Sequence, residues 1–122
     1  MEDRYLFRGK CIDNGEWMSG SYYEFIGKSY ILKPPFASKN SVYVVDPSTI
    51  CQCTGLKDKS GRRIFENDIV KDNVIYGVVK WDNANAMYII DDRDDGYQVY
   101  SDWWHEIEVI GNQFDNPELL EV

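Results

Sequence analysis

The cysteines and the single histidine carry the strongest metal-binding chemistry in this chain. Cys51 and Cys53 are separated by one residue, so on a strand both thiols lie on one face. Together with Cys11 and His105 they would supply the four ligands of a tetrahedral zinc site. Structural zinc sites present two ligand pairs from separate turns, whereas here Cys11 and His105 are single. The spacing favours packed, free cysteines, and we expect neither a metal nor another cofactor.

His105 is also the natural candidate for a general base, because Asp102 and Glu106 lie close to it in sequence. No serine or cysteine nucleophile is connected to it by a recognisable motif. We therefore expect no catalytic residue and no enzymatic activity. A small enzyme that uses His105 remains an alternative.

The acidic segment DDRDDG at 91–96 invites a comparison with calcium-binding loops. When Gly96 is placed at the sixth loop position, Arg93 falls at the third, where a cation ligand is required. The flanking residues have strand patterns rather than helical ones. The segment is typical of a solvated hairpin turn.

Aromatic side chains are concentrated in the carboxyl-terminal half. Trp103 and Trp104 are adjacent, and strand alternation cannot place both on one face, so one of them is expected to point outward. An exposed tryptophan flanked by acidic residues is typical of a protein-binding surface. The predicted protein-binding residues are Trp103, Trp104, Tyr88 and Tyr97.

A cluster of basic residues surrounds one turn, at Lys57, Lys59, Arg62 and Arg63. Asp58 lies among them, and the mixture indicates a solvent-exposed turn surface. The whole chain has 13 Lys and Arg against 21 Asp and Glu, a formal net charge of −8, which opposes binding to phosphate. A nucleic-acid-binding protein and an acidic mimic of DNA remain alternatives. The first would need these four residues to converge on one face.

The pattern of apolar runs and turn residues predicts a mainly β protein of a single domain, residues 1–122. Short β runs recur between turn signals, and only the segment DNPELLE predicts a helical turn, with Asn116 as its cap. We expect an amino-terminal meander, residues 1–53, packed against a carboxyl-terminal SH3-like β-barrel, residues 54–122. The predicted β runs are 4–12, 17–26, 29–35, 42–46, 74–82, 87–91, 97–104 and 106–112.

The segment 54–71, TGLKDKSGRRIFENDIVK, joins the two predicted parts. Gly61 supplies a positive φ in its first turn, and Asn67 is a residue that tolerates the left-handed region before a strand begins at Asp68. With IEVIGNQFDNPELL at 107–120, this segment resembles the paired motifs of the YopX family. The residues YLFRGK and GEWMSG are similar to that family's start. The family commonly has Gly at the position of Asn67, and an aromatic at that of Cys53, where we expect an apolar packing site.

The resemblance implies a small protein encoded by a bacteriophage or prophage, with a mostly β fold and no established activity. It assigns no catalytic residue. We expect a non-enzymatic accessory protein, a protein-binding or self-assembling β module in the cytoplasm of a bacterial host. Its partner would be a host or phage protein or its own copies. No apolar run approaches the ~20 residues of a membrane span, and the amino end lacks a basic stretch followed by an apolar one.

Overall fold

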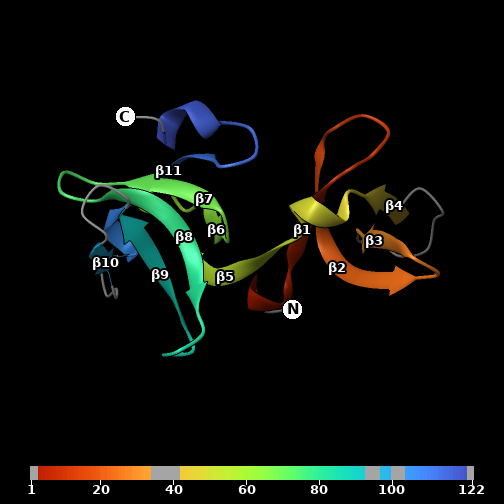
Figure 1. The fold of residues 1–122 in the computed structure, drawn as a ribbon, viewed down its shortest axis with the longest axis horizontal. Coiled ribbons are helices and arrows are strands. Elements are labelled where there is room, and N and C mark those ends of the chain that lie inside the picture. The colour runs from red at the N-terminus through yellow and green to blue at the C-terminus, as the bar shows by residue number, and fades with distance from the viewer. Residues whose placement is uncertain (1–2, 34–41, 93–96, 100–103, 121–122) are drawn as a thin grey trace. The chain divides into compact units, whose positions relative to one another are not determined.

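The fold is mainly β and consists of antiparallel strands joined by short turns (Figure 1). The structure, a computed structural model, describes residues 3–33, 42–92, 97–99 and 104–120, with the backbone alone for residues 92, 97–99 and 105. Within these ranges the only helical elements are short 3₁₀ turns. The chain forms two compact units, Met1–Cys53 (unit 1) and Thr54–Val122 (unit 2), which are described separately below.

Unit 1 is one antiparallel sheet with the strand order β4-β3-β2-β1-β5. Two 3₁₀ turns accompany it, η1 (Asp3–Tyr5) and η3 (Pro47–Thr49). The strands are β1 (Phe7–Lys10), β2 (Trp17–Phe25), β3 (Lys28–Leu32), β4 (Val42–Val45) and the first residues of β5 (Cys51–Lys57).

Hairpin geometry in unit 1 follows local backbone chemistry. Strands β2 and β3 are joined by the two-residue turn Ile26-Gly27, where both residues have positive φ, 48° and 73°, as a type I′ turn requires. The pair Asn14-Gly15 is typical of a two-residue hairpin turn, but the connection from β1 to β2 is longer. It is a six-residue loop, closed by a hydrogen bond of 2.8 Å from the Cys11 N–H to the Glu16 carbonyl.

The core of unit 1 contains all three cysteines. Cys11, Cys51 and Cys53 are buried and form no disulfide bond, in agreement with the expected packing role of Cys53. The Cys51 thiol donates a hydrogen bond of 3.2 Å to the Thr49 carbonyl. Just beyond β1, Cys11 pairs with Val45 at the outer edge of β4, so that end of the edge strand is covered.

Unit 2 contains a five-stranded antiparallel sheet with the order β10-β9-β8-β7-β11. Strand β5 ends in this unit and is followed by β6. No closed barrel is found among the strands that the structure describes. The strands are β6 (Arg63–Phe65), β7 (Asp68–Lys71), β8 (Tyr76–Asp82), β9 (Met87–Asp92), β10 (Tyr97–Val99) and β11 (Glu108–Asn112).

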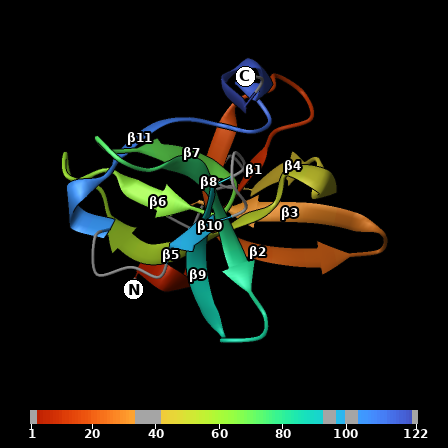
Figure 2. The same cartoon turned by 60° about the vertical axis from the view of Figure 1, so that its left-hand side comes forward.

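Apolar residues from these strands, from the turn η4 (Trp104–Glu106) and from the positions just before β8 and β11 form the core of unit 2. Figure 2 shows β8 and β9 running side by side within it. The buried core residues are Ile64, Val70, Ile75, Val79, Ile90, Trp104, Ile107 and Val109.

The segment 54–71 lies wholly in unit 2 and contains both predicted reversals. Gly61 has a φ of 83° and Asn67 a φ of 70°, which confirms the backbone predictions for both residues. Asn67 occupies the turn between β6 and β7, and its N–H donates to the Val79 carbonyl at 2.9 Å.

The predicted helical turn at the carboxyl end is the 3₁₀ turn η5 (Pro117–Leu120). Asn116 precedes this turn, and its carbonyl accepts the N–H of Leu119 at 3.1 Å, as the predicted cap residue should. Its side-chain oxygen accepts a hydrogen bond of 3.2 Å from the N–H of Asn112. Gly111 leaves the necessary room, because a Cβ there would approach Asn116 Oδ1 to 2.5 Å.

Gly20→Ala tests the packing of the β2–β3 hairpin. A Cβ at Gly20 would overlap the backbone carbonyl of Leu32, which has no room to move without loss of strand pairing. We expect a loss of about 3 kcal/mol in the free energy of unfolding, measured by urea denaturation. The neighbouring change Ser21→Ala is the control and should cost less than about 1 kcal/mol. Equal stability of Gly20→Ala and the natural chain would contradict the described pairing.

Candidate functional site

Asp58, at the start of the basic turn, is buried and not part of the turn's solvated surface. Only 6% of the residue is exposed. One carboxylate oxygen accepts the N–H groups of Ser60 and Arg62, both at 2.9 Å, and the other accepts the N–H of Val109 at 3.0 Å. This corrects the expectation that the charges of this turn belong to its surface, because Asp58 is held inside by three backbone donors.

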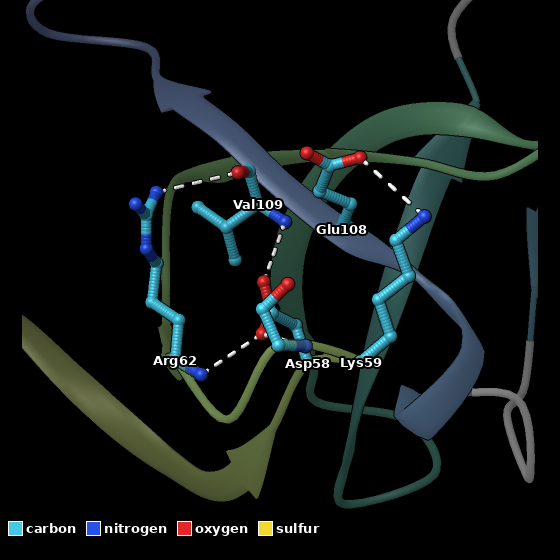
Figure 3. A network of polar contacts seen from close by, with 6 residues as sticks. Asp58, Lys59, Arg62, Glu108 and Val109 are labelled. Atoms are coloured by element: carbon cyan, nitrogen blue, oxygen red, sulfur yellow. Dashed lines mark hydrogen bonds and ion pairs between the residues drawn. The ribbon is translucent and has the colours of Figure 1, made fainter.

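The same turn covers the outer edge of β11 (Figure 3). Arg62 donates from its guanidinium to the Val109 carbonyl at 3.3 Å, and the backbone N–H of Lys59 donates to the Ile107 carbonyl at 2.9 Å. The Lys59 ammonium lies 3.6 Å from the Glu108 carboxylate, and both side chains are largely exposed. The four predicted basic residues are all exposed, but Lys59 and Arg62 contact β11 instead of facing a common ligand surface.

The turn that contains Asp58 contacts β11 near its start, and a second junction, between Gln113 and Asn67, lies at the other end of the strand. The side chain of Gln113 donates to Asn67 Oδ1 at 2.6 Å, and its backbone N–H donates to the Asn67 carbonyl at 3.0 Å. Asp68 is almost fully buried and accepts the N–H of Phe65 at 2.8 Å. Between the two junctions β11 pairs with β7 along its length. Residues 54–71 and 107–120 therefore hold each other in place.

These two segments carry the resemblance that the sequence suggested, and a family model described as YopX protein matches residues 6–121. The chain belongs to the YopX family. The match covers nearly all of the chain and both units. No curated protein matches this YopX protein.

Of the four predicted aromatic binding residues, the structure describes the side chains of two, Trp104 and Tyr88, and both pack in or against the core of unit 2. Trp104 is 7% exposed and lies in the core of unit 2, which corrects its prediction, because an enclosed ring cannot make a surface contact. Tyr88 packs against the same core and meets Trp81 edge to face, with ring centroids 5.0 Å apart. Trp103 and the side chain of Tyr97 lie outside the described part of the chain.

The remaining candidate chemistry is only partly covered by the residues that the structure describes. The side chain of His105 and most of the acidic segment 91–96 lie outside the described residues. Among the side chains that are described, no group of three or more His, Cys, Asp or Glu residues is arranged to hold a metal ion. None of the 3₁₀ turns in residues 3–33, 42–92 and 104–120 has the length and apolar character that a membrane crossing needs.

Unit 1 instead presents an apolar surface that the sequence analysis missed. Register places Tyr23 opposite Tyr30, Tyr30 opposite Val44, and Val44 beside Ile12, whose N–H donates to the Val44 carbonyl at 3.0 Å. Register partners share a face, so these side chains form one row across the sheet. The Tyr23 and Tyr30 rings stack with centroids 4.9 Å apart. Alternation along β2 adds Phe25 to this face.

We call the set Ile12, Tyr23, Phe25, Ile26, Tyr30 and Val44 the outer face of unit 1. Ile12 and Phe25 are each more than half exposed, and Ile26 at the turn is 84% exposed. Figure 2 shows the β2–β3 hairpin extending to this turn. Contiguous exposed apolar side chains of this kind mark interaction surfaces.

The backbone of Ile26 strengthens this reading. A β-branched residue at positive φ is a conformational outlier that costs about 1–2 kcal/mol, and Asn or Gly would fit the type I′ turn better. Because Ile26 is also exposed, burial within unit 1 does not compensate for that cost. Strain of this kind is characteristic of functional positions.

A cavity of about 320 Å³ lies beside the hairpin tip. Ile12, Val44 and Pro47 give it apolar walls, and Lys28 and Asp13 contribute one charge of each sign. The volume is at the lower end of the ~300–1,000 Å³ typical of ligand pockets, so one large apolar side chain would fit.

Charge is distributed unevenly between the units. Residues 1–53 contain six Lys or Arg and six Asp or Glu, whereas residues 54–122 contain seven against fifteen. The whole net charge of −8 therefore belongs to unit 2, and the outer face lies on the neutral unit. Arg8 and Lys10 lie over the ring of Trp17, at 4.6 and 5.6 Å from its centroid, at the opposite end of β2 from the tip.

Asp58→Asn tests the junction between the turn and β11. Burial by itself raises the pKa of Asp58, but the N–H groups of Val109, Arg62 and Ser60 and the charge of Arg62 hold it below its usual value. Its contribution to stability is therefore complete above the unfolded pKa of about 3.9 and is lost as the pH falls through the folded value. An amide would set its NH₂ against the Val109 N–H, so we expect a loss of about 2–4 kcal/mol at pH 7.

Urea denaturation at several pH values measures this effect. The difference in the free energy of unfolding between the natural chain and Asp58→Asn should shrink as the pH falls below about 4, because the carboxylate of the unfolded chain takes up a proton first and that of the folded chain follows at lower pH. A difference that is the same at pH 3 and pH 7 would show that the charge of Asp58 has no such role.

Ile26→Asn tests the strain at the hairpin tip. Asn tolerates positive φ, so we expect the free energy of unfolding of the monomer to rise by about 1 kcal/mol, measured by thermal or urea denaturation at low protein concentration. Val74→Asn is the matched control, because Val74 is 87% exposed but its φ is not positive. It should change stability by less than about 0.5 kcal/mol. A destabilised Ile26→Asn would refute the argument from strain.

Proposed function

We propose that this YopX protein is a non-enzymatic accessory protein of a phage or prophage that acts by binding protein through the outer face of unit 1. The observation that supports this function is the exposed apolar row ending in the strained hairpin tip. A side chain that costs folding energy and is exposed is understandable when a partner buries it.

The electrostatics support the same proposal. The neutral unit 1 offers an apolar contact surface, and the acidic unit 2 would attract a basic partner or keep the protein away from DNA. The partner would be a host or phage protein or a further copy of the chain, in the cytoplasm of the bacterium. The antiparallel order of unit 2 is compatible with the SH3-like barrel predicted from the sequence, which remains part of the proposal.

Affinity capture with a matched pair of variants tests this function. The tagged chain would be expressed in a bacterial host, and the co-purifying proteins, including an untagged copy of the chain, quantified by mass spectrometry. We expect at least one protein to be lost with the double variant Phe25→Ser, Ile26→Asn and kept with Val74→Asn. The interaction should then be reproduced with the purified partner by calorimetry, with a loss of affinity of tenfold or more, about 1.4 kcal/mol.

Circular dichroism of both variants shows whether they are folded. If every captured protein is retained by the folded double variant, the outer face is not the binding surface and the proposal fails. Capture of nucleic acid in place of protein would support the nucleic-acid alternative. A bound small molecule near His105 would direct attention to an enzyme.

A further inference from the structure

We infer that the partner of the outer face is a second copy of this chain, in a two-fold symmetric dimer formed by unit 1 against unit 1. This inference rests on the proposed function and names the occupant of the same surface. Three features of the hairpin tip support it.

The tip presents a projection and a cavity next to each other. Phe25 and Ile26 project beside the turn, and Ile12, Val44 and Pro47 form the walls of a cavity whose lining also includes the adjacent turn residue Gly27. In a two-fold interface the same patch is used by both subunits, so a projecting side chain of one copy must meet a cavity of the other. The hairpin tip satisfies this condition, because it carries the projecting side chains and the cavity next to each other. The Ile26 side chain of one copy would fill the cavity of its partner.

The charges at the tip are also self-complementary. Lys28 and Asp13 both line the cavity, so a two-fold axis near it brings a positive residue of one copy toward a negative residue of the other, twice. An interface between two copies of unit 2 would instead bring together two surfaces that each carry the net charge of −8. Like charges oppose association, and the neutral unit 1 avoids this repulsion.

The conformation of Ile26 gives the third argument. In the monomer the residue is strained and exposed, whereas in the dimer the Ile26 side chain of each copy is buried in the cavity of the other copy. Burial of an apolar side chain in a partner's cavity is typical of the few residues that dominate an interface. Asn in its place would relieve the strain and remove the contact, so Ile26→Asn should make the monomer more stable and the dimer weaker. A purely structural role for Ile26 predicts no change in association.

Sedimentation of the purified full chain over a range of micromolar concentrations tests the inference. We expect the natural chain and Val74→Asn to form dimers with the same dissociation constant. Ile26→Asn should raise that constant at least about a hundredfold, because the symmetry repeats the change in both copies. If Ile26→Asn does not fold, Ile12→Asn, which alters the cavity wall, replaces it with the same expected result.

Disulfide crosslinking identifies the face independently. The native cysteines are buried, so single exposed cysteines are selective. A mixture of Ile26→Cys and Ile12→Cys chains should give covalent mixed dimers under mild oxidation. Mixtures of either chain with Val74→Cys should give only background.

The following results of the sedimentation and capture experiments would overturn the inference of a second copy. A chain that stays monomeric at all concentrations, or a dimer that keeps its affinity in Ile26→Asn, excludes a dimer through the tip. If the chain is monomeric but capture of another protein still depends on Phe25 and Ile26, the second copy is wrong and the proposed function stands. If neither dimerisation nor capture depends on the tip, both proposals fail.

Discussion

The carboxylate of Asp58 is the contact on which unit 2 depends. It fixes the turn after β5 by accepting two N–H groups of that turn, and it accepts the N–H of Val109 on the outer edge of β11. A strand edge with unpaired backbone groups invites pairing with other chains, and here a charged turn occupies it. At the other end of the strand, Gln113 bonds to Asn67 through its side chain and its backbone N–H and so continues the pairing of β11 with the β7 side. In these segments the side chains of Asp58, Arg62 and Asp68 therefore satisfy backbone groups of the same unit.

Unit 1 has the opposite character. Its cysteines and aliphatic residues fill the inner side of the sheet, while aromatic and aliphatic residues remain on the outer face. Within the described part of unit 1, Ile26 at the tip of this face is the only β-branched residue with a positive φ. Charge and apolar surface are thus divided between the units, with the acidic residues in excess on one and the exposed apolar row on the other.

Local chemistry made part of this structure predictable from sequence. Alternating runs located most strands, and the turns at Gly61 and Asn67 were predicted because positive φ depends on residue type. The burial of Asp58 was not, because its partner Val109 is 51 residues away in sequence. Trp104 was named among the binding residues because the sequence predicts only that one of two adjacent tryptophans points outward and not which one. The outer face was missed because the register of β2, β3 and β4 decides which residues align, and because propensity places Asn or Gly where the chain has Ile26.

The internal use of both family segments has a consequence for how YopX proteins are compared. The polar side chains of the two segments by which this chain resembles the family specify a scaffold, since Asp58 and Arg62 bond to backbone groups of unit 2 and Gln113 bonds to the Asn67 side chain. The residues that indicate family membership therefore need not contact a partner. Two members can share the scaffold and differ in specificity when their hairpin tips differ. A function measured for one member should therefore be transferred to another only where the residues of the tip agree as well.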